Sequence, residues 1–436
     1  MEEFPGFSAY FARLNTNCLE HLFFAAYLIL FSWLVTIVPF LKKSGLTAPQ
    51  LIIFFLIKII AGIFYGWIGV YYGELAQMVD TWAYHYEGIK AYELLKIDRS
   101  AYWQSLFGNN YGGYGNFFLS DNSWWNDLHS NAFIMLLSLF DFLSFGNYYI
   151  NVVFYSFITF FGSIGLYRVM ADVFPEKKQL VLFTTFLLPS FIYWTSGVHK
   201  DGLVFLAFML IIYNVYFGLK ESQIFKRSIL IVLGLVLLLI LRNFLLVIFL
   251  PALVAWIIAF KGNKNPLLIF SSVYAISIFL FFAMRYVSPS LNFPQAVVEK
   301  QKSFLSLKGD SPVPVTVLKP SPSSFFKNLP QALSLTVLRP YPSDVKHLLS
   351  LASCLETYLL LIGFILFSVW RANRYPNAFL LFCLFFSFSV LLTIGYTVSF
   401  LGAIVRYRSI VLPFLVIPMV CFTNWQKVFN AVSRRY

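Results

Sequence analysis

Three ionisable residues stand together in a short connection between two apolar segments. His199, Lys200 and Asp201 lie in the sequence TSGVHKDG, between the apolar residues 180–194 and 203–217. Lysine and histidine can hold a phosphate group, and a carboxylate can accept a proton from a hydroxyl. The structural alternative is that Lys200 and Asp201 pair and cap the following helix, with His199 as a bystander.

An acidic residue follows the second apolar segment. Asp80 lies in QMVDTWAYHYEG, where a helix would place Asp80, Tyr84 and Glu87 on one face, with His85 nearby. A carboxylate just outside a membrane can act as a general base on a hydroxyl when burial and neighbours tune it. We therefore predict a catalytic group of Asp80, His85 and Glu87. The alternative is an acid that is only solvated in a loop.

Four arginines and one glutamate mark the ends of other apolar segments. Arg242 interrupts LLLLILRNFLLVIFL, which is costly in a membrane unless the side chain reaches water or a partner. Arg339 precedes the ninth apolar segment, Glu356 lies inside it, and Arg406 and Arg408 precede the last one. A single boundary arginine is usually an anchor. One guanidinium group can bind two phosphate oxygens at once. We therefore expect the four arginines to form one anion site, with Glu356 as a partner.

Most of the chain consists of apolar segments that are long enough to cross a bilayer. Of the 436 residues, 59% are hydrophobic and only 12% are charged. Backbone groups inside a bilayer must be satisfied within their own segment, so such spans are helices. The sequence predicts an all-α polytopic membrane protein with about eleven transmembrane helices, at residues 21–41, 51–72, 148–170, 179–195, 201–219, 228–241, 243–260, 267–285, 348–370, 377–396 and 409–425.

The distribution of lysine and arginine predicts the orientation of these spans. Basic residues gather after the odd-numbered spans, and the positive-inside rule places those loops in the cytoplasm. Residues 73–147 then form a first extracytoplasmic loop with an interfacial helix, and residues 286–347 form a second. Residues 1–436 are expected to form a single integral membrane domain. If residues 228–260 formed one span instead of two, the sidedness of everything after them would be inverted.

The cysteines, the histidines and the net charge indicate which kinds of site the sequence favours. The four cysteines form no CxxC pair and the five histidines no HExxH motif, so we expect neither a disulfide framework nor a zinc site. The net charge of +13 is dispersed between the spans. This distribution fits cytoplasmic loops and an anionic ligand better than it fits nucleic acid.

The layout resembles the membrane-embedded glycosyltransferases of the C superfamily (GT-C), which use polyprenyl-phosphate-linked sugars. The resemblance covers about residues 50–430, and the chain differs from many members in having two spans before the acidic loop and no second acid beside Asp80. The similar features are the acidic loop sequence VDTWAYHYEG, the amphipathic segment NAFIMLLSLFDFLSF, the hairpin LPSFIYWTSGVHKDG, the interrupted run LLILRNF, the pair LRPYPSD and CLETY, and the basic sequence VRYRSIVLPF.

The resemblance implies a transferase mechanism. Asp80 would be the base toward an acceptor hydroxyl, in an inverting transfer without a cofactor. Some members use a divalent metal, but this chain has no dense carboxylate cluster, so we favour metal-independent transfer. The lipid-linked phosphate would be held by Lys200, Arg242, Arg339, Arg406 and Arg408, with His199, Asp201 and Glu356 beside it.

The same resemblance implies partners and a location. The partners would be a polyprenyl-phosphate-linked sugar, membrane lipid, and an acceptor glycan, lipid or protein, with no nucleic acid. The protein would be a multi-pass component of a bacterial cytoplasmic membrane that serves the cell envelope, with its site facing the exterior.

Other functions stay open at this stage. A polymerase of envelope polysaccharide, such as O-antigen or exopolysaccharide, would also need outward arginines, for a lipid pyrophosphate, but no essential acid. A transporter or flippase of an anionic lipid or solute would use broken helices, and the short segment 228–241 favours it. A structural subunit of an envelope complex would leave the clustering of charge on one face unexplained.

Overall fold

The computed structural model describes residues 18–71, 79–108, 113–115, 117, 123–262, 264–307, 309, 311–372 and 376–433. Within these ranges the regular structure is helical, apart from two isolated β-bridges. The helices are, in chain order, α2 (Cys18–Ile37), α3 (Pro39–Lys42), α4 (Ala48–Tyr71), α6 (Val79–Ile97), α7 (Arg99–Leu106), α8 (Trp124–Ser144), α9 (Tyr148–Val173), α10 (Lys178–Leu187), α11 (Pro189–Ser196), α12 (Lys200–Lys220), α13 (Ser228–Lys261), α14 (Pro266–Ala283), α15 (Phe293–Ser306), α16 (Pro322–Val337), α17 (Leu348–Trp370), α18 (Ala378–Thr397), α19 (Leu401–Ser409), α20 (Leu412–Phe422) and α21 (Trp425–Ser433).

The long apolar helices confirm the prediction of an all-α polytopic membrane protein. Eight helices in the described ranges are long and apolar enough to cross a bilayer: α2, α4, α9, α12, α13, α14, α17 and α18. The pair α19 and α20, bent by 64°, would make a ninth span if it crosses as one unit. The predicted count of eleven therefore stays a prediction, because it also requires both halves of α13, and α10 with α11, to cross.

Helix α13 is broken at Arg242, where the backbone is not helical (φ −156°, ψ 84°). Both halves of α13 lie against the same turn of α12. A Cβ added to Gly234 would come within 2.7 Å of Ile211, and the Phe249 ring lies 5.2 Å from that of Phe208. The chain therefore reverses at Arg242, which agrees with two segments, 228–241 and 243–260, and not with one straight span.

The predicted span 179–195 is divided as well. Helix α10 ends at Leu187 and α11 begins at Pro189, whose missing N–H suits the first position of a helix and interrupts a longer one. Neither α10 nor α11 is long enough to span a bilayer alone.

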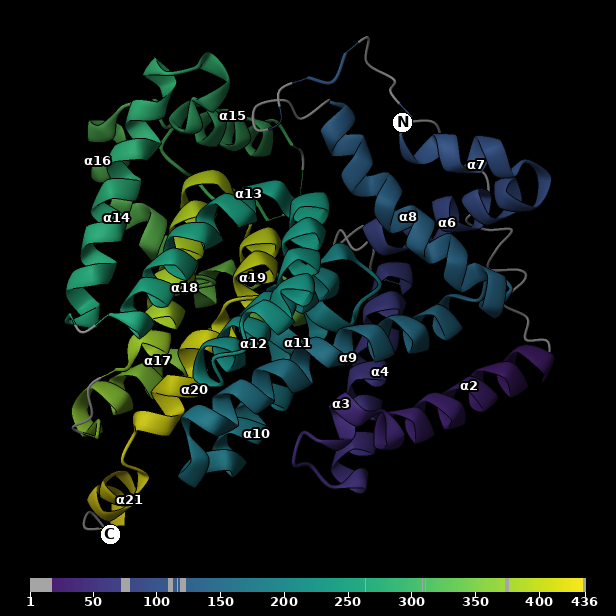
Figure 1. Ribbon diagram of the computed structural model, residues 1–436, viewed down its shortest axis with the longest axis horizontal. Helices are drawn as coiled ribbons and strands as arrows, with labels where there is room; N and C mark the ends of the chain where they lie inside the picture. Colours follow the sequence, from purple (N-terminus) through teal and green to yellow (C-terminus); the bar gives the residue numbers. More distant parts are fainter. Residues whose placement is uncertain are drawn as a thin grey trace.

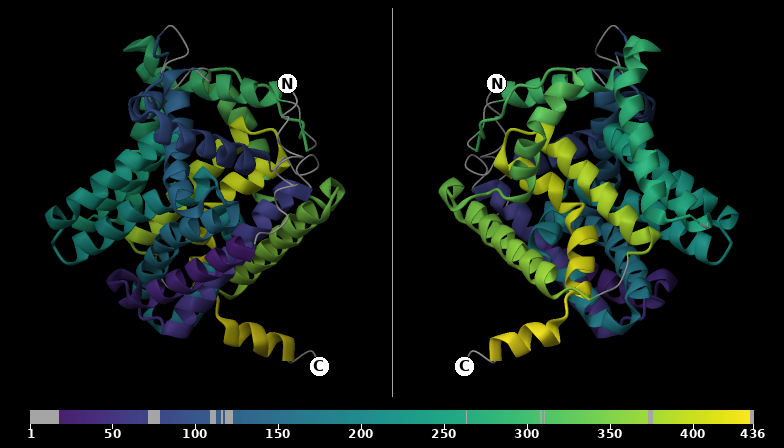
Figure 2. Two further views of the ribbon diagram at one scale, coloured as in Figure 1. Left: turned by 90° about the vertical axis from the view of Figure 1, so that its right-hand side faces the viewer. Right: turned by 90° about the vertical axis from the view of Figure 1, so that its left-hand side faces the viewer.

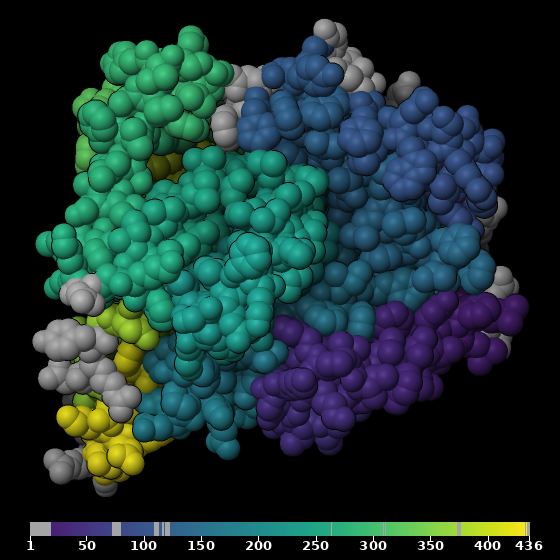
Figure 3. Space-filling view, in the orientation of Figure 1, coloured from purple at the N-terminus to yellow at the C-terminus, as the bar shows by residue number. Residues whose placement is uncertain are grey.

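Three helices form the centre of the bundle. In the apolar window that could span a bilayer, 78% of the residues of α9 and 67% of those of α12 and α18 are buried. The corresponding shares are 6% for α2, 11% for α14 and 17% for α17. Figure 1 shows α9 and α12 in the middle, with α6, α7 and α8 as a lobe at the upper right and α15 and α16 at the upper left. The space-filling view in Figure 3 shows the purple N-terminal helices along the lower edge. We therefore infer that lipid covers α2, α14 and α17.

The two predicted outer loops are partly described. Residues 73–78, 109–112, 116 and 118–122 of the first lie outside the described residues, and its described part carries α6, α7 and α8. The predicted interfacial helix at residues 131–145 is the C-terminal part of α8. Residues 286–347 carry α15 and α16.

The basic connections lie together at one end of the bundle. Lys177 donates to the carbonyl oxygen of Thr423 (3.5 Å), Arg371 forms a β-bridge with Thr423, and Lys220 pairs with Asp172 (2.6 Å). Figure 2 shows the C-terminal helix at this end and the green segment with α15 and α16 at the other. Three of the loops assigned to the cytoplasm by the positive-inside rule, those at Lys177, Lys220 and Arg371, thus lie near this end.

Candidate active site

The connection between α11 and α12 is a tight, non-helical turn. Helix α11 ends at Ser196 and α12 begins at Lys200, so Gly197, Val198 and His199 form the turn. Gly197 lies against the ring of Tyr65, where an added Cβ would come within 2.4 Å of ring carbons. Only glycine allows this close approach.

Side chains from three other helices hold carbonyl groups of this turn and of the end of α11. Each donor comes from a different helix, so the turn is fixed relative to α4, α6 and α9 at once. The three bonds run from Lys58 Nζ to the oxygen of Thr195 (2.9 Å), from Thr81 Oγ1 to that of Val198 (2.9 Å), and from the Tyr155 hydroxyl to that of His199.

Asp201 is the buried centre of a charged cluster. Its carboxylate accepts hydrogen bonds from Arg406 Nε at 2.5 Å and from Arg242 Nη2 at 2.8 Å. The Asp201 side chain is fully buried, and a buried carboxylate is tolerated only when it is paired. The break in α13 and the short helix α19 thus each deliver one guanidinium group to the first turn of α12.

His199 and Asp80 complete the cluster at its exposed edge. Arg406 Nη2 donates toward the His199 ring, 2.5 Å from Nδ1 and 2.6 Å from Nε2. The Asp80 carboxylate lies 3.5 Å from Arg406 Nη1 and 3.8 Å from His199 Nε2. Asp80 is 58% exposed, whereas the Arg406 side chain is 13% exposed. The solvent-accessible carboxylate of Asp80 thus lies next to the largely buried guanidinium group of Arg406.

Burial, and then the Arg406 guanidinium, lower the pKa of His199 to about 4. The imidazole is therefore neutral at pH 7 and can accept a hydrogen bond.

Lys200 approaches the site from the other side. Its ammonium donates to Ser130 Oγ at 3.2 Å and lies 5.1 Å from the centroid of the Tyr84 ring. The Tyr84 ring in turn contacts His199 edge-on at 5.4 Å. The predicted residues that the fold brings together, called the Asp80 cluster below, are Asp80, His199, Lys200, Asp201, Arg242 and Arg406.

The Asp80 cluster contains more basic than acidic side chains. The basic ones are Lys200, Arg242 and Arg406, and the acidic ones are Asp80 and Asp201. Both guanidinium groups pair mainly with Asp201. Lys200 is therefore the basic side chain left for a singly charged anion such as a phosphodiester, which would favour its protonated form.

Arg408 lies outside this cluster, contrary to expectation. Residues two positions apart on a helix project to nearly opposite sides, so Arg406 and Arg408 cannot serve one pocket. Arg408 Nη1 donates to the carbonyl oxygens of Thr336 (2.9 Å) and Arg339 (2.6 Å), and Nη2 donates to Thr357 Oγ1 (2.6 Å). Arg408 therefore ties α19 to the C-terminal end of α16 and to α17.

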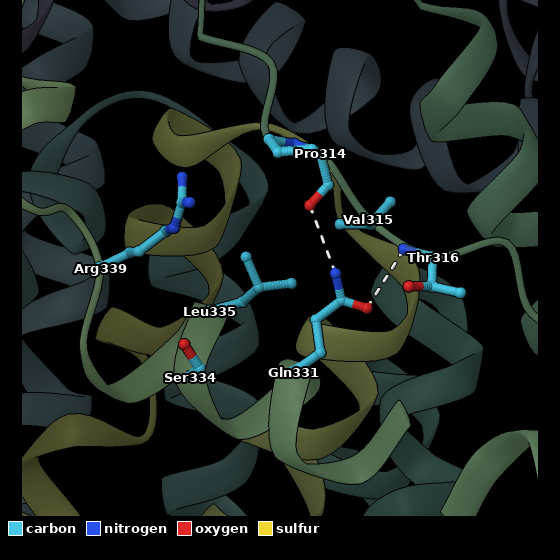
Figure 4. Close-up of a pocket in the computed structure, with 7 residues that line it drawn as sticks. All are labelled: Pro314, Val315, Thr316, Gln331, Ser334, Leu335 and Arg339. Atoms are coloured by element: carbon cyan, nitrogen blue, oxygen red, sulfur yellow. Dashed lines mark hydrogen bonds between the residues drawn. The ribbon is translucent and has the colours of Figure 1, made fainter. Parts of the chain in front are cut away.

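Arg339 and Glu356 also lie on that side of α19. The Arg339 side chain pairs with Asp344 at 3.3 Å, and Glu356 accepts a hydrogen bond from the Ser190 backbone at 3.0 Å. Arg339 borders a hollow of about 470 Å³ (Figure 4). The other lining residues are Pro314, Val315, Thr316, Gln331, Ser334 and Leu335. The single anion site expected from four arginines is thus two separate groups.

His85 and Glu87 do not share the position of Asp80. The His85 side chain is fully buried, 4.0 Å from Asp141, and burial lowers its pKa to about 3. Glu87 pairs with Lys90 at 2.7 Å on an exposed part of α6. Of the predicted catalytic group, only Asp80 lies next to the guanidinium group of Arg406.

Sequence reasoning missed the residues that hold the turn. Lys58 is 5% exposed, and its ammonium binds the carbonyl oxygen of Thr195 near the end of α11. An ionisable residue inside a span was the available signal. Thr81 and Tyr155 carry no comparable signal, because hydroxyl side chains are common in such helices.

The chain matches no protein-family model, no curated protein and no solved structure.

Proposed function

We propose that the protein is a glycosyltransferase that moves a sugar from a polyprenyl-phosphate-linked donor to an acceptor hydroxyl. The observation that carries this proposal is the half-exposed carboxylate of Asp80, 3.5 Å from a buried guanidinium that Asp201 holds in place. A base beside a fixed cation is what a transfer needs when a hydroxyl attacks and an anionic group leaves.

The residues take the following roles in this proposal. Asp80 accepts the proton of the acceptor hydroxyl, whose oxygen attacks the anomeric carbon of the donor. The bond between that carbon and the phosphate oxygen breaks, and its electron pair stays on the phosphate. Arg406 and Lys200 stabilise the charge that develops on the leaving phosphate. A direct displacement of this kind inverts the anomeric centre, and no metal takes part in it.

Asp201 acts through the arginines. By accepting from Arg406 Nε and Arg242 Nη2, it orients both guanidinium groups before the substrate arrives. Fixed donors need no reorganisation during the reaction, which is the main source of electrostatic catalysis. Asp201 is therefore a positioning residue in this mechanism.

The arrangement of the two ends supports a site at the outer face of a bacterial cytoplasmic membrane. The basic connections share one end, which the positive-inside rule assigns to the cytoplasm. The turn at Gly197–His199 and the reversal at Arg242 connect helices at the opposite end.

The decisive experiment replaces Asp80 with Asn and measures sugar transfer in membranes supplied with radiolabelled polyprenyl phosphate sugars. We expect a loss of about 10²- to 10⁴-fold, the usual contribution of a general base. Glu87→Gln, on the same helix and also solvent-accessible, is the matched control and should leave transfer unchanged. Undiminished transfer by Asp80→Asn would end the proposal.

One observation favours the transporter alternative. Helix α13 is broken at Arg242, and broken helices with charged residues at the break are common in transporters. The two functions differ in their products. A transporter moves a labelled lipid across vesicles without cleaving it, whereas the transferase releases polyprenyl phosphate and leaves the labelled sugar on the acceptor.

A further inference from the structure

The C-terminal helix α21 is strongly amphipathic. In its sequence, Trp425, Val428, Phe429 and Val432 recur at the i, i+3, i+4, i+7 spacing of one helix face. The other face carries Gln426, Lys427 and Asn430. Such a helix needs an apolar surface against its stripe.

The bundle covers only one edge of this stripe. Val428 is buried, whereas Phe429 is 66% exposed and contacts the Trp425 ring at 6.4 Å. The start of α21 is held to the end of α17, because Asn424 N donates to the carbonyl oxygen of Trp370 at 2.8 Å. Figure 2 shows α21 running out sideways from beneath the bundle. Most of the apolar face therefore extends beyond the protein.

The end of the bundle that carries α21 is basic. Lys177, Lys178 and Arg371 lie in the connections beside it, and Lys427 lies on the polar face of α21 itself. Val428, at one edge of the stripe, packs against the bundle, and Lys427 lies on the polar face, away from the stripe. This is the orientation of a helix that lies in a bilayer interface, with its charge toward water.

We propose that α21 lies in the headgroup region of the leaflet at the basic end and binds anionic phospholipid there. Phe429 and Trp425 insert among the acyl chains next to α17. Lys178, Arg371 and Lys427 hold the phosphate groups of the headgroups. This inference does not depend on the proposed transferase activity.

Two labelled variants of the full chain test the proposal. Phe429→Cys places a thiol on the apolar stripe, and Gln426→Cys places one on the polar face. Each is labelled with an environment-sensitive fluorophore and reconstituted into vesicles of phosphatidylcholine alone or with 30% phosphatidylglycerol. The labelled wild type gives the background, since the described native cysteines are buried. Quenching is measured with lipid-borne nitroxide and with aqueous iodide.

We expect the probe at position 429 to shift to shorter wavelength and to be quenched by the lipid nitroxide, more strongly with phosphatidylglycerol. High salt should remove that extra quenching, because surface electrostatics are screened. The probe at position 426 should respond to iodide. Equal iodide quenching of both probes would overturn the proposal. A shift that depends on protein density and not on lipid composition would also overturn it, in favour of a second copy of the chain.

Discussion

The carboxylate of Asp201 accepts a 2.5 Å hydrogen bond from Nε of Arg406, a residue 205 positions later in the chain. This bond joins the first turn of α12 to α19. Together with the bond from Arg242, it brings cations from two helices, α13 and α19, to one buried acid of α12.

Replacing Asp201 with Asn should destabilise the protein strongly. Arg406 and Arg242 would lose their shared counter-charge in a buried setting, which costs about 3 kcal/mol or more. Glu221→Gln removes the exposed partner of Arg227 and should cost less than about 1 kcal/mol. Thermal unfolding of both variants in detergent measures the difference. Equal stability of the two variants would contradict the assigned role of Asp201.

The substitutions Arg406→Lys and Arg408→Lys should have different effects, the first on catalysis and the second on stability. Lysine keeps the charge of Arg406 but cannot bridge Asp201, His199 and a phosphate at once, so we expect kcat to fall by about 10²-fold. Arg408 binds only protein groups on the opposite face of α19, so its substitution should lower the melting temperature and leave kcat nearly unchanged. Kinetics and unfolding of both variants check this, and a reversed pattern would disprove the division into two groups.

Thr81→Val should misplace Asp80 without touching its carboxylate. The hydroxyl of Thr81 bonds the carbonyl oxygen of Val198 and the Tyr148 hydroxyl, which holds the start of α6 against the turn. Leaving that buried carbonyl without a donor should cost about 1–3 kcal/mol, and kcat should fall. Thr81→Ser keeps the hydroxyl and should restore both. If valine and serine behave alike, Thr81 does not position Asp80.

Acid should destabilise the protein through His199. Its pKa is about 4 in the fold and 6.5 in the unfolded chain, so between these values the unfolded state binds a proton that the folded state lacks. The contribution of neutral His199 is complete above about pH 6.5 and falls as the pH drops toward about 4. At about 1.4 kcal/mol per pH unit, the loss is on the order of 3 kcal/mol.

A second buried group opposes this pH dependence. Burial raises the pKa of Asp141 to about 6, so its contribution is complete at low pH and falls as the pH rises through about 6. The effect of His199 is therefore measured as the difference in melting temperature between the wild type and His199→Gln at each pH. A difference that does not change between pH 4 and 7 would contradict the assignment.

The sequence located the charged residues of the site but not their partners. His199, Lys200 and Asp201 were visible because ionisable groups are rare beside long apolar segments, and Arg242 was visible for the same reason. The expected group of four arginines divides because Arg406 and Arg408 are separated by half a turn of helix. This angular separation has an effect only because α19 is a helix that packs between two different surfaces.

The sequence by itself determined the class of the fold, its long helices and the basic end of the bundle. These follow from composition and local hydrophobicity, which act on each segment separately. Only the tertiary structure decided that Asp80 meets Arg406 and that His85 is buried. Only the fold shows that Lys58 caps the end of α11. Such contacts depend on the rotation and depth of each helix against its neighbours, and packing among many side chains sets these, not any single stretch of the chain.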